Sequence, residues 1–513
     1  MIKENLPYGH LLALTHSTMK YLPIAFFVLI FITSCQKTHS NLNNKNTYRP
    51  DTAMLANAFE TFKETSLNHR RFKHVDIEPL ILKRAKNELF KITELGHSVQ
   101  KRAIYQLAYG TGNKRIMLWS QMHGNESTAT MALFDLFNFL EGKDDQYDTI
   151  RHLLKEKTTL YFLPMLNPDG AEIFNRRNAL DIDLNRDARE TASPEARLLK
   201  TAANTNKPDF GFNLHDQHIY YNVPGTRNPA TISFLAPAYN HEKYINDVRG
   251  RAMQLIVGMN KLLQQYIPNG VAKYDDTHEP RGFGDNFQKW GASTVLIESG
   301  GFKNDPEKQY IRKLNFLIIL NALIEIAQES YLQYDQDAYK DIPQNAAKLS
   351  DLLIKNIRAE RDSVNYTVDL AIKRDEFNAP DSTFYIRGRI DDVGDLKDSY
   401  GYEEFDAKGL SFMKGKRYPK TINHPNELTK ETVTTLLREG YIAVQIRNTA
   451  ADKHYKWPLL ITSSGTVYGN SPSLGSQANF FLAKEGKPVY AVVNGYLIDL
   501  SKELRDDFRN YVQ

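Results

Sequence analysis

A histidine and a glutamate stand two residues apart, directly after an apolar run, in the segment MHGNESTAT. They are His123 and Glu126, and a helix-like stretch follows them. A two-residue spacer can place both side chains around one metal ion, and an imidazole with a carboxylate suits zinc. One further ligand and an open position would complete a hydrolytic zinc site. A turn histidine beside a surface glutamate would give the same pattern without a metal.

The third ligand is expected in PDFGFNLHDQH, a strand-like run that ends in two histidines. We favour His215, because it is the first to leave the strand. His218 remains the alternative. A short-spacer pair with one distant ligand leaves the fourth zinc position free for water.

Two of the three arginines and one of the asparagines stand out in LNPDGAEIFNRRNALDIDLNRD. They are Arg176, Asn185 and Arg186. Guanidinium groups suit the binding of a carboxylate and the stabilisation of an oxyanion. A solvated basic loop is the competing interpretation.

A carboxylate ends the apolar run in GASTVLIESGG. This residue, Glu298, would be expensive to bury without a partner. Beside an activated water it could act as a general base. A strand-end glutamate that reaches solvent is the alternative.

Apolar strand-like runs alternate with helix-period segments between about residues 48 and 333, which predicts an α/β domain. Ser127 is expected to cap a helix over 128–140. Strands are expected over 115–119, 159–164, 210–214 and 294–297, and helices over 128–140 and 313–331.

From about residue 350 the pattern changes to a short helix followed by strand and turn signals. We expect a catalytic domain over 51–333, a linker over 334–349 and a smaller β-rich domain over 350–513. The β-rich domain contains no cluster of histidine and glutamate.

The composition excludes several classes of protein. Lysine and arginine total 65 and aspartate and glutamate 61, so a net charge of +4 over 513 residues predicts no nucleic-acid partner. Hydrophobic residues make up 41%, as in soluble globular domains. The single cysteine, Cys35, excludes intrachain disulfides, cysteine zinc sites and iron–sulfur clusters.

The N-terminal segment has the parts of an export signal: a lysine, a short apolar run and small residues before Cys35. The sequence ITSC resembles a bacterial lipobox, which implies lipid attachment to Cys35. We therefore expect a signal over 1–35, with a start at Met19 as one possibility, and a flexible tether over 36–50. The protein is then expected to be exported to a bacterial cell envelope and held to the membrane by lipid.

The order of these segments resembles the zinc carboxypeptidases of the carboxypeptidase A type over roughly residues 74–327. HGNE, NPDG and DLNR are followed by a strand that ends in histidine and a strand that ends in glutamate. The resemblance implies a mixed sheet with helices on both faces and one Zn²⁺ per chain. It implies zinc ligands His123, Glu126 and His215, the general base Glu298, the oxyanion-stabilising Arg176, the terminal-carboxylate ligands Asn185 and Arg186, the mobile Tyr274, and Asp183 as the carboxylate that orients a ligand histidine.

The resemblance implies a zinc metallocarboxypeptidase that acts on peptides or peptidoglycan peptides. Three alternatives remain open: a γ-D-glutamyl cell-wall peptide hydrolase, an N-acyl amino acid deacylase, and an inactive peptidase-like surface binding protein. Asp216 and Gln217 follow the histidine where the family usually has a small residue. Segments of the C-terminal region faintly resemble the accessory β-sandwich of amidohydrolases, which implies a structural or binding role.

Overall fold

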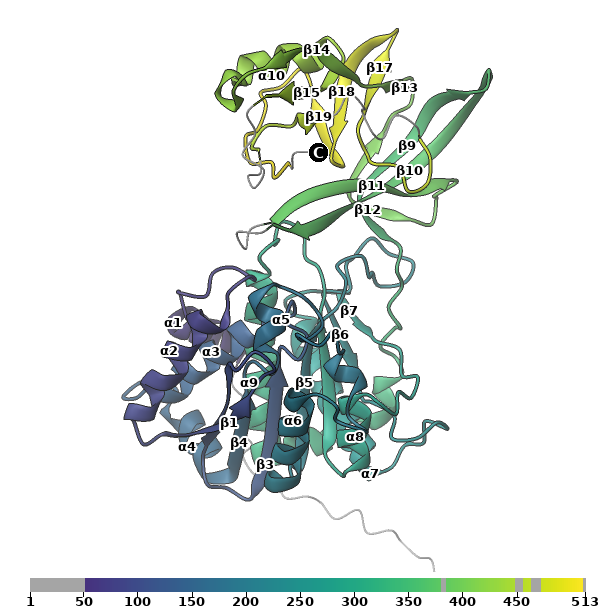
Figure 1. The fold of residues 1–513 in the computed structure, drawn as a ribbon. Coiled ribbons are helices and arrows are strands. Elements are labelled where there is room, and N and C mark those ends of the chain that lie inside the picture. The colour runs from purple at the N-terminus through teal and green to yellow at the C-terminus, as the bar shows by residue number, and fades with distance from the viewer. Residues whose placement is uncertain (1–50, 380–383, 448–454, 463–471, 511–513) are drawn as a thin grey trace, which may run out of the picture. The chain divides into compact units, whose positions relative to one another are not determined.

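The computed structural model describes residues 51–379, 384–447, 455–462 and 472–510. An α/β region is followed along the chain by a β-rich region, and a mixed sheet with helices on both faces forms the first (Figure 1). The predicted fold class is therefore confirmed.

Eight strands form the mixed sheet of the α/β region. They are β1 (Phe90–His97), β2 (Ala103–Tyr109), β3 (Lys114–Ser120), β4 (Thr158–Leu163), β5 (Phe210–Asp216), β6 (Ile232–Leu235), β7 (Val271–Lys273) and β8 (Ser293–Ser299). Their order is β1-β2-β4-β3-β5-β8-β6-β7. The central strands β4, β3, β5 and β8 run parallel, whereas β1, β2 and β6 pair antiparallel with a neighbour.

Helices cover both faces of this sheet. They are α1 (Thr52–Phe62), α2 (His74–Leu82), α3 (Thr128–Glu141), α4 (Asp148–Lys157), α5 (Pro168–Glu172), α6 (Pro194–Asn206), α7 (Asp247–Leu263), α8 (Phe283–Lys289) and α9 (Gln309–Gln328), with short 3₁₀ turns η1 (Lys83–Lys86) and η2 (Leu184–Arg186). The strands expected over 115–119, 159–164, 210–214 and 294–297 correspond to β3, β4, β5 and β8, and the expected helices to α3 and α9.

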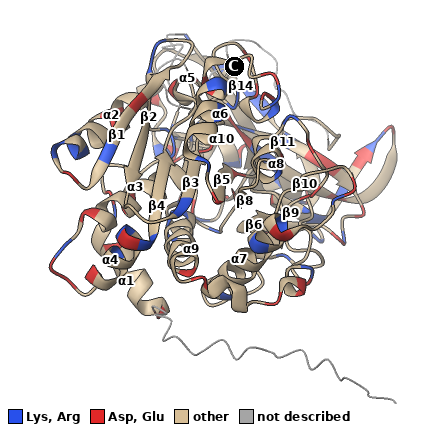
Figure 2. Ribbon diagram, turned by 90° about the horizontal axis from the view of Figure 1, so that it is seen from below, with Lys and Arg blue, Asp and Glu red and all other residues tan. Residues whose placement is uncertain are grey.

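Alternation along β3 separates the two cores. Ile116 and Leu118 belong to a core that includes residues of α1, α3, α4, α7 and α9, whereas Met117 and Trp119 belong to a second core with α6 and α8. Successive side chains of a strand point to opposite faces, so one buried strand supplies both cores. Basic and acidic residues are interspersed along the elements (Figure 2).

The prediction that the side chain of Ser127 caps α3 by a hydrogen bond is wrong. Ser127 does occupy the position before the helix, but its side chain makes no capping bond. Its hydroxyl instead donates to the carbonyl oxygen of Arg70 at 2.7 Å. This bond joins the start of α3 to the segment that follows α1, and such a distant partner cannot be predicted from local sequence.

The segment between the two regions contains η3 (Ser330–Gln333) and η4 (Gln336–Tyr339). Tyr339 and Ile342 are buried in the core shared with α7 and α9. Backbone bonds also join Asn222 and Ala346, at 2.7 Å and 2.9 Å in the two directions. This stretch is therefore packed against the α/β region.

The β-rich region contains one helix among its described residues, α10 (Lys430–Arg438), and one 3₁₀ turn, η5 (Pro425–Glu427). Its larger sheet has the order β11-β10-β9-β13-β17-β18-β19, with β12 beside β9, and a smaller sheet has the order β14-β15-β16. The strands are β9 (Leu349–Arg361), β10 (Val364–Asn378), β11 (Phe384–Gly394), β12 (Tyr400–Asp406), β13 (Ser411–Lys414), β14 (Lys416–Ile422), β15 (Tyr441–Ile446), β16 (Leu460–Thr462), β17 (Phe480–Lys484), β18 (Lys487–Val493) and β19 (Tyr496–Asp499).

The short helix expected near residue 350 is wrong, because β9 begins at Leu349. Leu352, Leu353 and Ile354 are all buried, since both faces of this part of the strand are covered. A strand buried on both faces shows a continuous apolar run, which periodicity does not separate from a helix.

No helix in the described ranges combines the length and the apolar character that crossing a bilayer requires. The predictions for Cys35, the signal and the tether lie outside the described residues.

A buried ion pair connects α9, α3 and the chain before Arg70. Arg312 is 0% exposed, its Nε donates to Asp135 at 2.7 Å, and one of its terminal nitrogens donates to the carbonyl oxygen of Glu64 at 2.8 Å. Removal of one partner leaves a buried charge unpaired, at a cost of about 3–5 kcal/mol.

Replacement of Arg312 with Met should therefore lower the free energy of unfolding by about 3–5 kcal/mol, measured by chemical denaturation. The adjacent Lys313 pairs with Glu60 at the surface, and Lys313→Gln is the matched control, expected to cost less than about 1 kcal/mol. Equal effects of the two substitutions would contradict this role of Arg312.

Candidate metal centre

Three parallel strands bring the predicted ligands to one edge of the sheet. His123 lies just beyond the end of β3, and His215 lies near the end of β5, the next strand across the sheet. Glu298, in β8, is directly opposite His215 in the strand register. Because the carboxyl ends of parallel strands meet at one edge, residues far apart in the sequence become neighbours there.

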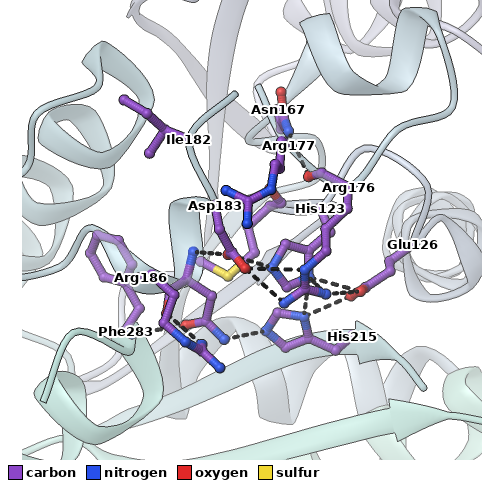
Figure 3. Close-up of polar contacts among 12 residues, drawn as sticks. His123, Glu126, Asn167, Arg176, Arg177, Ile182, Asp183, Arg186, His215 and Phe283 are labelled. Carbon is purple, nitrogen blue, oxygen red and sulfur yellow. Dashed lines mark hydrogen bonds and ion pairs between the residues drawn. The ribbon is translucent and has the colours of Figure 1, made fainter. Parts of the chain in front are cut away.

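The side chains of His123, Glu126 and His215 converge in one buried cluster (Figure 3). Nδ1 of His123 lies 2.8 Å from one carboxylate oxygen of Glu126, and Nδ1 of His215 lies 2.7 Å from the other. The two Nδ1 atoms are 3.2 Å apart. The structure thus brings together the three residues that the sequence suggests as ligands.

This arrangement fits a zinc ion. A tetrahedral ion with Zn–N bonds of about 2.0–2.1 Å would separate two ligand nitrogens by roughly 3.3 Å. The observed separation of 3.2 Å between the Nδ1 atoms is close to this value, whereas the two separations between Nδ1 and carboxylate oxygen, 2.8 Å and 2.7 Å, are hydrogen-bonding distances that would lengthen around an ion. Two imidazoles and a carboxylate also form the donor set of hydrolytic zinc sites, which keep a further position open.

Asp183 fixes the orientation of one of these imidazoles. Its Oδ1 lies 3.0 Å from Nε2 of His123, so the Nε2–H of the ring donates to the carboxylate and Nδ1 carries the lone pair, with Nη1 of Arg176 3.1 Å from it. Burial opposes ionisation of Asp183, but its bond to His123 and the nearby guanidinium of Arg176 hold its pKa below the usual range.

Arg176 joins the same network from the cavity side. Its Nη1 donates to Glu126 at 3.0 Å, and its Nε donates to Asp183 at 3.1 Å. The side chain is 42% exposed, so this cation reaches both a buried carboxylate and the open cavity. The guanidinium therefore lies at the boundary between the buried cluster and the cavity.

Glu298 is buried at the same edge, with 8% exposure. Burial raises its pKa well above the usual range, and the negative charges of Glu126 and Asp216 raise it further. A carboxyl group in such surroundings readily holds a proton, as a group that transfers one must.

Asn185 and Arg186 lie in η2, beside the loop that precedes α8. Oδ1 of Asn185 accepts a bond from the backbone N–H of Phe283 at 2.9 Å, which fixes the amide. Nε of Arg186 pairs with Glu279 at 3.1 Å. Arg186 thus already holds a carboxylate that belongs to the protein.

One cavity of about 760 Å³ connects these groups. Of the residues predicted from the sequence, it is lined by His123, Glu126, Arg176, Asn185, Arg186, His215, Tyr274 and Glu298. Asp183 does not line the cavity and contacts Nε2 of His123. His218, the alternative ligand, also lines the cavity but stacks on Tyr220 with ring centroids 4.5 Å apart, outside the cluster.

Asp183 is expected from the sequence as a support of the cluster, but other supports are not. Asp216 forms a buried ion pair with Lys308 at 3.1 Å, and its backbone N–H donates to Glu126 at 3.1 Å. Asp216 thus helps to hold the carboxylate of Glu126. Asp216 stands out in the sequence as a departure from the family that the chain resembles, but nothing local marks Lys308 as its partner.

NPDG acts as a support for HGNE. A Cβ on Gly124 would lie 2.0 Å from the carbonyl carbon of Gly170, so the two turns approach too closely for a side chain. The amide of Asn167 donates to the carbonyl oxygens of Met122 and Arg176, each at 3.3 Å. These contacts fix the loop that carries His123 and Glu126.

A family model matches part of the chain. Residues 81–232 match the family model described as zinc carboxypeptidase. Human carboxypeptidase D is 23% identical over 296 residues, covering 50% of this chain and 21% of the human protein. A gamma-D-glutamyl-L-diamino acid endopeptidase 1 from Lysinibacillus sphaericus is 36% identical over 86 residues, covering 16% of this chain and 22% of that protein. The chain thus spans about a fifth of the length of these two relatives.

Among solved structures, a metallo-carboxypeptidase from Pseudomonas aeruginosa in complex with (2-guanidinoethylmercapto)succinic acid aligns with a TM-score of 0.40 and 20% identity. The alignment covers 51% of this chain and 70% of that one.

Zinc titration separates the candidate ligands. We expect about one zinc per chain, a loss of binding in His215→Ala, and retention of binding in His218→Ala, measured by metal content after dialysis. Asp183→Asn should weaken zinc affinity by about 10- to 100-fold, because the orienting acceptor loses its charge. Loss of zinc in His218→Ala alone would contradict the assignment of His215.

Proposed function

With a segment of the zinc carboxypeptidase family at residues 81–232, we propose that this protein is a zinc-dependent metallocarboxypeptidase. It hydrolyses the C-terminal peptide bond of its substrate. The observation that carries the proposal is the buried cluster of His123, Glu126 and His215, which opens on the same cavity as Glu298 and Arg186.

Zinc held by the cluster would supply a Lewis acid that polarises the scissile carbonyl and activates water. Glu298 takes the proton of the attacking water and delivers it to the leaving amine. Its place opposite His215 in the strand register supports this role. Its burial supports the role as well, since it keeps bulk water from competing for the proton.

Arg176 stabilises the negative charge that develops on the carbonyl oxygen. Because Glu126 and Asp183 already fix the guanidinium, little free energy is lost in reorienting it when that charge appears. Its partly exposed face lies toward the cavity.

Asn185 and Arg186 bind the free C-terminal carboxylate of the substrate. Bidentate recognition by a guanidinium suits a carboxylate. Without substrate, the guanidinium of Arg186 is paired with the carboxylate of Glu279. The substrate carboxylate therefore displaces the side chain of Glu279 when it binds. Recognition of the chain end makes the enzyme an exopeptidase, and Tyr274, on the same cavity wall, would cover the bound end.

Substitution of Glu298 with Gln should reduce kcat/KM for release of a C-terminal residue by about 10²–10⁴-fold, because the amide cannot accept the water proton. The variant should still bind one zinc. The assay is release of amino acids from a mixed peptide panel, with C-terminally amidated peptides as controls that wild type leaves intact. Full activity of Glu298→Gln would contradict the general-base role.

A second candidate substrate is a cell-wall peptide with a γ-D-glutamyl bond. The 36% identity to the Lysinibacillus endopeptidase over 86 residues favours it. The metal and Glu298 would keep their roles, and only the group beyond the scissile bond would change. Hydrolysis of murein peptides without hydrolysis of ordinary peptides would select this candidate. An acyl amino acid as the sole substrate would select the deacylase, and zinc binding without any hydrolysis would select the binding protein.

We also propose export and lipid attachment at Cys35, so that the enzyme is tethered to a bacterial cell envelope. The support is the apolar segment before ITSC. Expressed from Met19 in a bacterium, wild type should incorporate labelled fatty acid and partition with membranes. Cys35→Ser should lose the label, whereas a label retained by the variant would contradict attachment at this residue.

A further inference from the structure

One strand of the β-rich region lines the catalytic cavity. Arg374, Asp375, Glu376 and Asn378 of β10 face the same space as the metal cluster. They follow the predicted catalytic domain in sequence, so neither the catalytic signature nor the family match at residues 81–232 includes them.

The cavity crosses the carboxyl edge of the sheet from one face to the other. On one side, Asn185 is bonded to Phe283 of α8, which belongs to the core shared with α6. On the other side, Lys308 stands at the start of α9, and its partner Asp216 is bonded to Thr128 at the start of α3. Helices α3 and α9 cover the opposite face.

β10 is attached to the second of these sides. Arg70 and Arg71 pair with Glu376 at 2.6 Å and 2.8 Å. Arg70 also belongs to the segment that Ser127 bonds at the start of α3. This attachment is thus made beside the start of α3, whereas Asn185, next to Arg186, is bonded to α8.

Further contacts fix the end of the strand. Asn378 accepts a bond from Arg71 at 2.6 Å and donates to the carbonyl oxygen of Ile173 at 2.8 Å. The guanidinium of Arg71 lies 4.0 Å from the ring centroid of Phe174, which also lines the cavity. The end of β10 is therefore bonded to both the segment before α2 and the segment after α5.

A second group of contacts holds β10 near Arg374. The hydroxyl of Tyr220 donates to Asp351 of β9, and Arg374 pairs with the same carboxylate at 3.2 Å. The hydroxyl of Tyr402 donates to the carbonyl oxygen of Ile219 at 2.6 Å. The loop that follows His215 is thus bonded directly to strands β9 and β12.

We propose that β10 is the wall that ends the substrate cleft on the side of the residues preceding the scissile bond. The inference rests on the proposed function: if Arg186 takes the C-terminal carboxylate, the rest of the substrate extends past the metal cluster toward β10. A chain that continues beyond a few residues meets the strand. The enzyme therefore prefers short peptides, and the β-rich region sets this preference.

The size of the cavity agrees with a short substrate. Its volume of about 760 Å³ lies within the roughly 300–1,000 Å³ typical of sites that enclose a small ligand. An extended peptide advances about 3.3–3.6 Å per residue, so a long substrate would have to leave this space. Discrimination by obstruction of the longer chain gives specificity without a new attractive contact.

The test compares kcat/KM for an acetylated dipeptide and an acetylated decapeptide that share their last two residues. Wild type should favour the dipeptide by about tenfold or more. The double variant Glu376→Ala, Asn378→Ala removes the attachments to Arg70, Arg71 and Ile173. It should raise kcat/KM for the decapeptide, a gain that damage to the fold would not produce.

Arg387→Gln is the matched control, because Arg387 lies on β11 of the same hairpin, over the ring of Phe377, and does not line the cavity. It should leave the ratio of the two kcat/KM values unchanged. Asn378→Ala alone serves if the double variant does not fold, with a smaller shift in the same direction.

Equal hydrolysis of both peptides by wild type would overturn the inference and leave the proposed function in place. A ratio that the β10 variants do not change would do the same. Hydrolysis of neither peptide would instead overturn the proposed function, together with the inference that rests on it.

Discussion

The candidate site depends on the close approach of three groups that are buried away from water. Two imidazole nitrogens and one carboxylate lie within 3.2 Å of one another. Nitrogen lone pairs this close repel unless a cation or a proton lies between them. The surrounding residues therefore have to hold the donors in place before a metal binds. Asp183 orients His123, the backbone of Asp216 holds Glu126, and the turn at Gly170 fixes the loop that carries His123 and Glu126.

The mixed sheet makes this convergence possible. β3, β5 and β8 are neighbours with one direction, so His123, His215 and Glu298 meet at one edge although long segments separate them in sequence. The two faces of the sheet supply different groups to the cavity. The α8 side holds Asn185 and Arg186, and the α3 and α9 side carries the attachments of β10. Fold, metal centre and proposed substrate length are thus linked through one sheet edge.

Local patterns sufficed for the fold class and for the strands and helices around the site, because apolar periodicity and ordered short motifs are local signals. They failed where distant partners or two-sided burial decide the structure. Ser127 bonds Arg70 in place of its own helix, and β9, buried on both faces, resembles a helix in sequence. The pairing of Asp216 with Lys308 and of Glu376 with Arg70 could not be predicted, since nothing local marks a partner so far along the chain.

Zinc binding at this cluster is tested most directly by anomalous X-ray diffraction at the zinc absorption edge, on crystals of the zinc-loaded protein. We expect one strong peak among Nδ1 of His123, the carboxylate of Glu126 and Nδ1 of His215, at about 2.0–2.2 Å from each. A peak on other side chains, or none at this cluster in stoichiometrically loaded protein, would contradict this expectation.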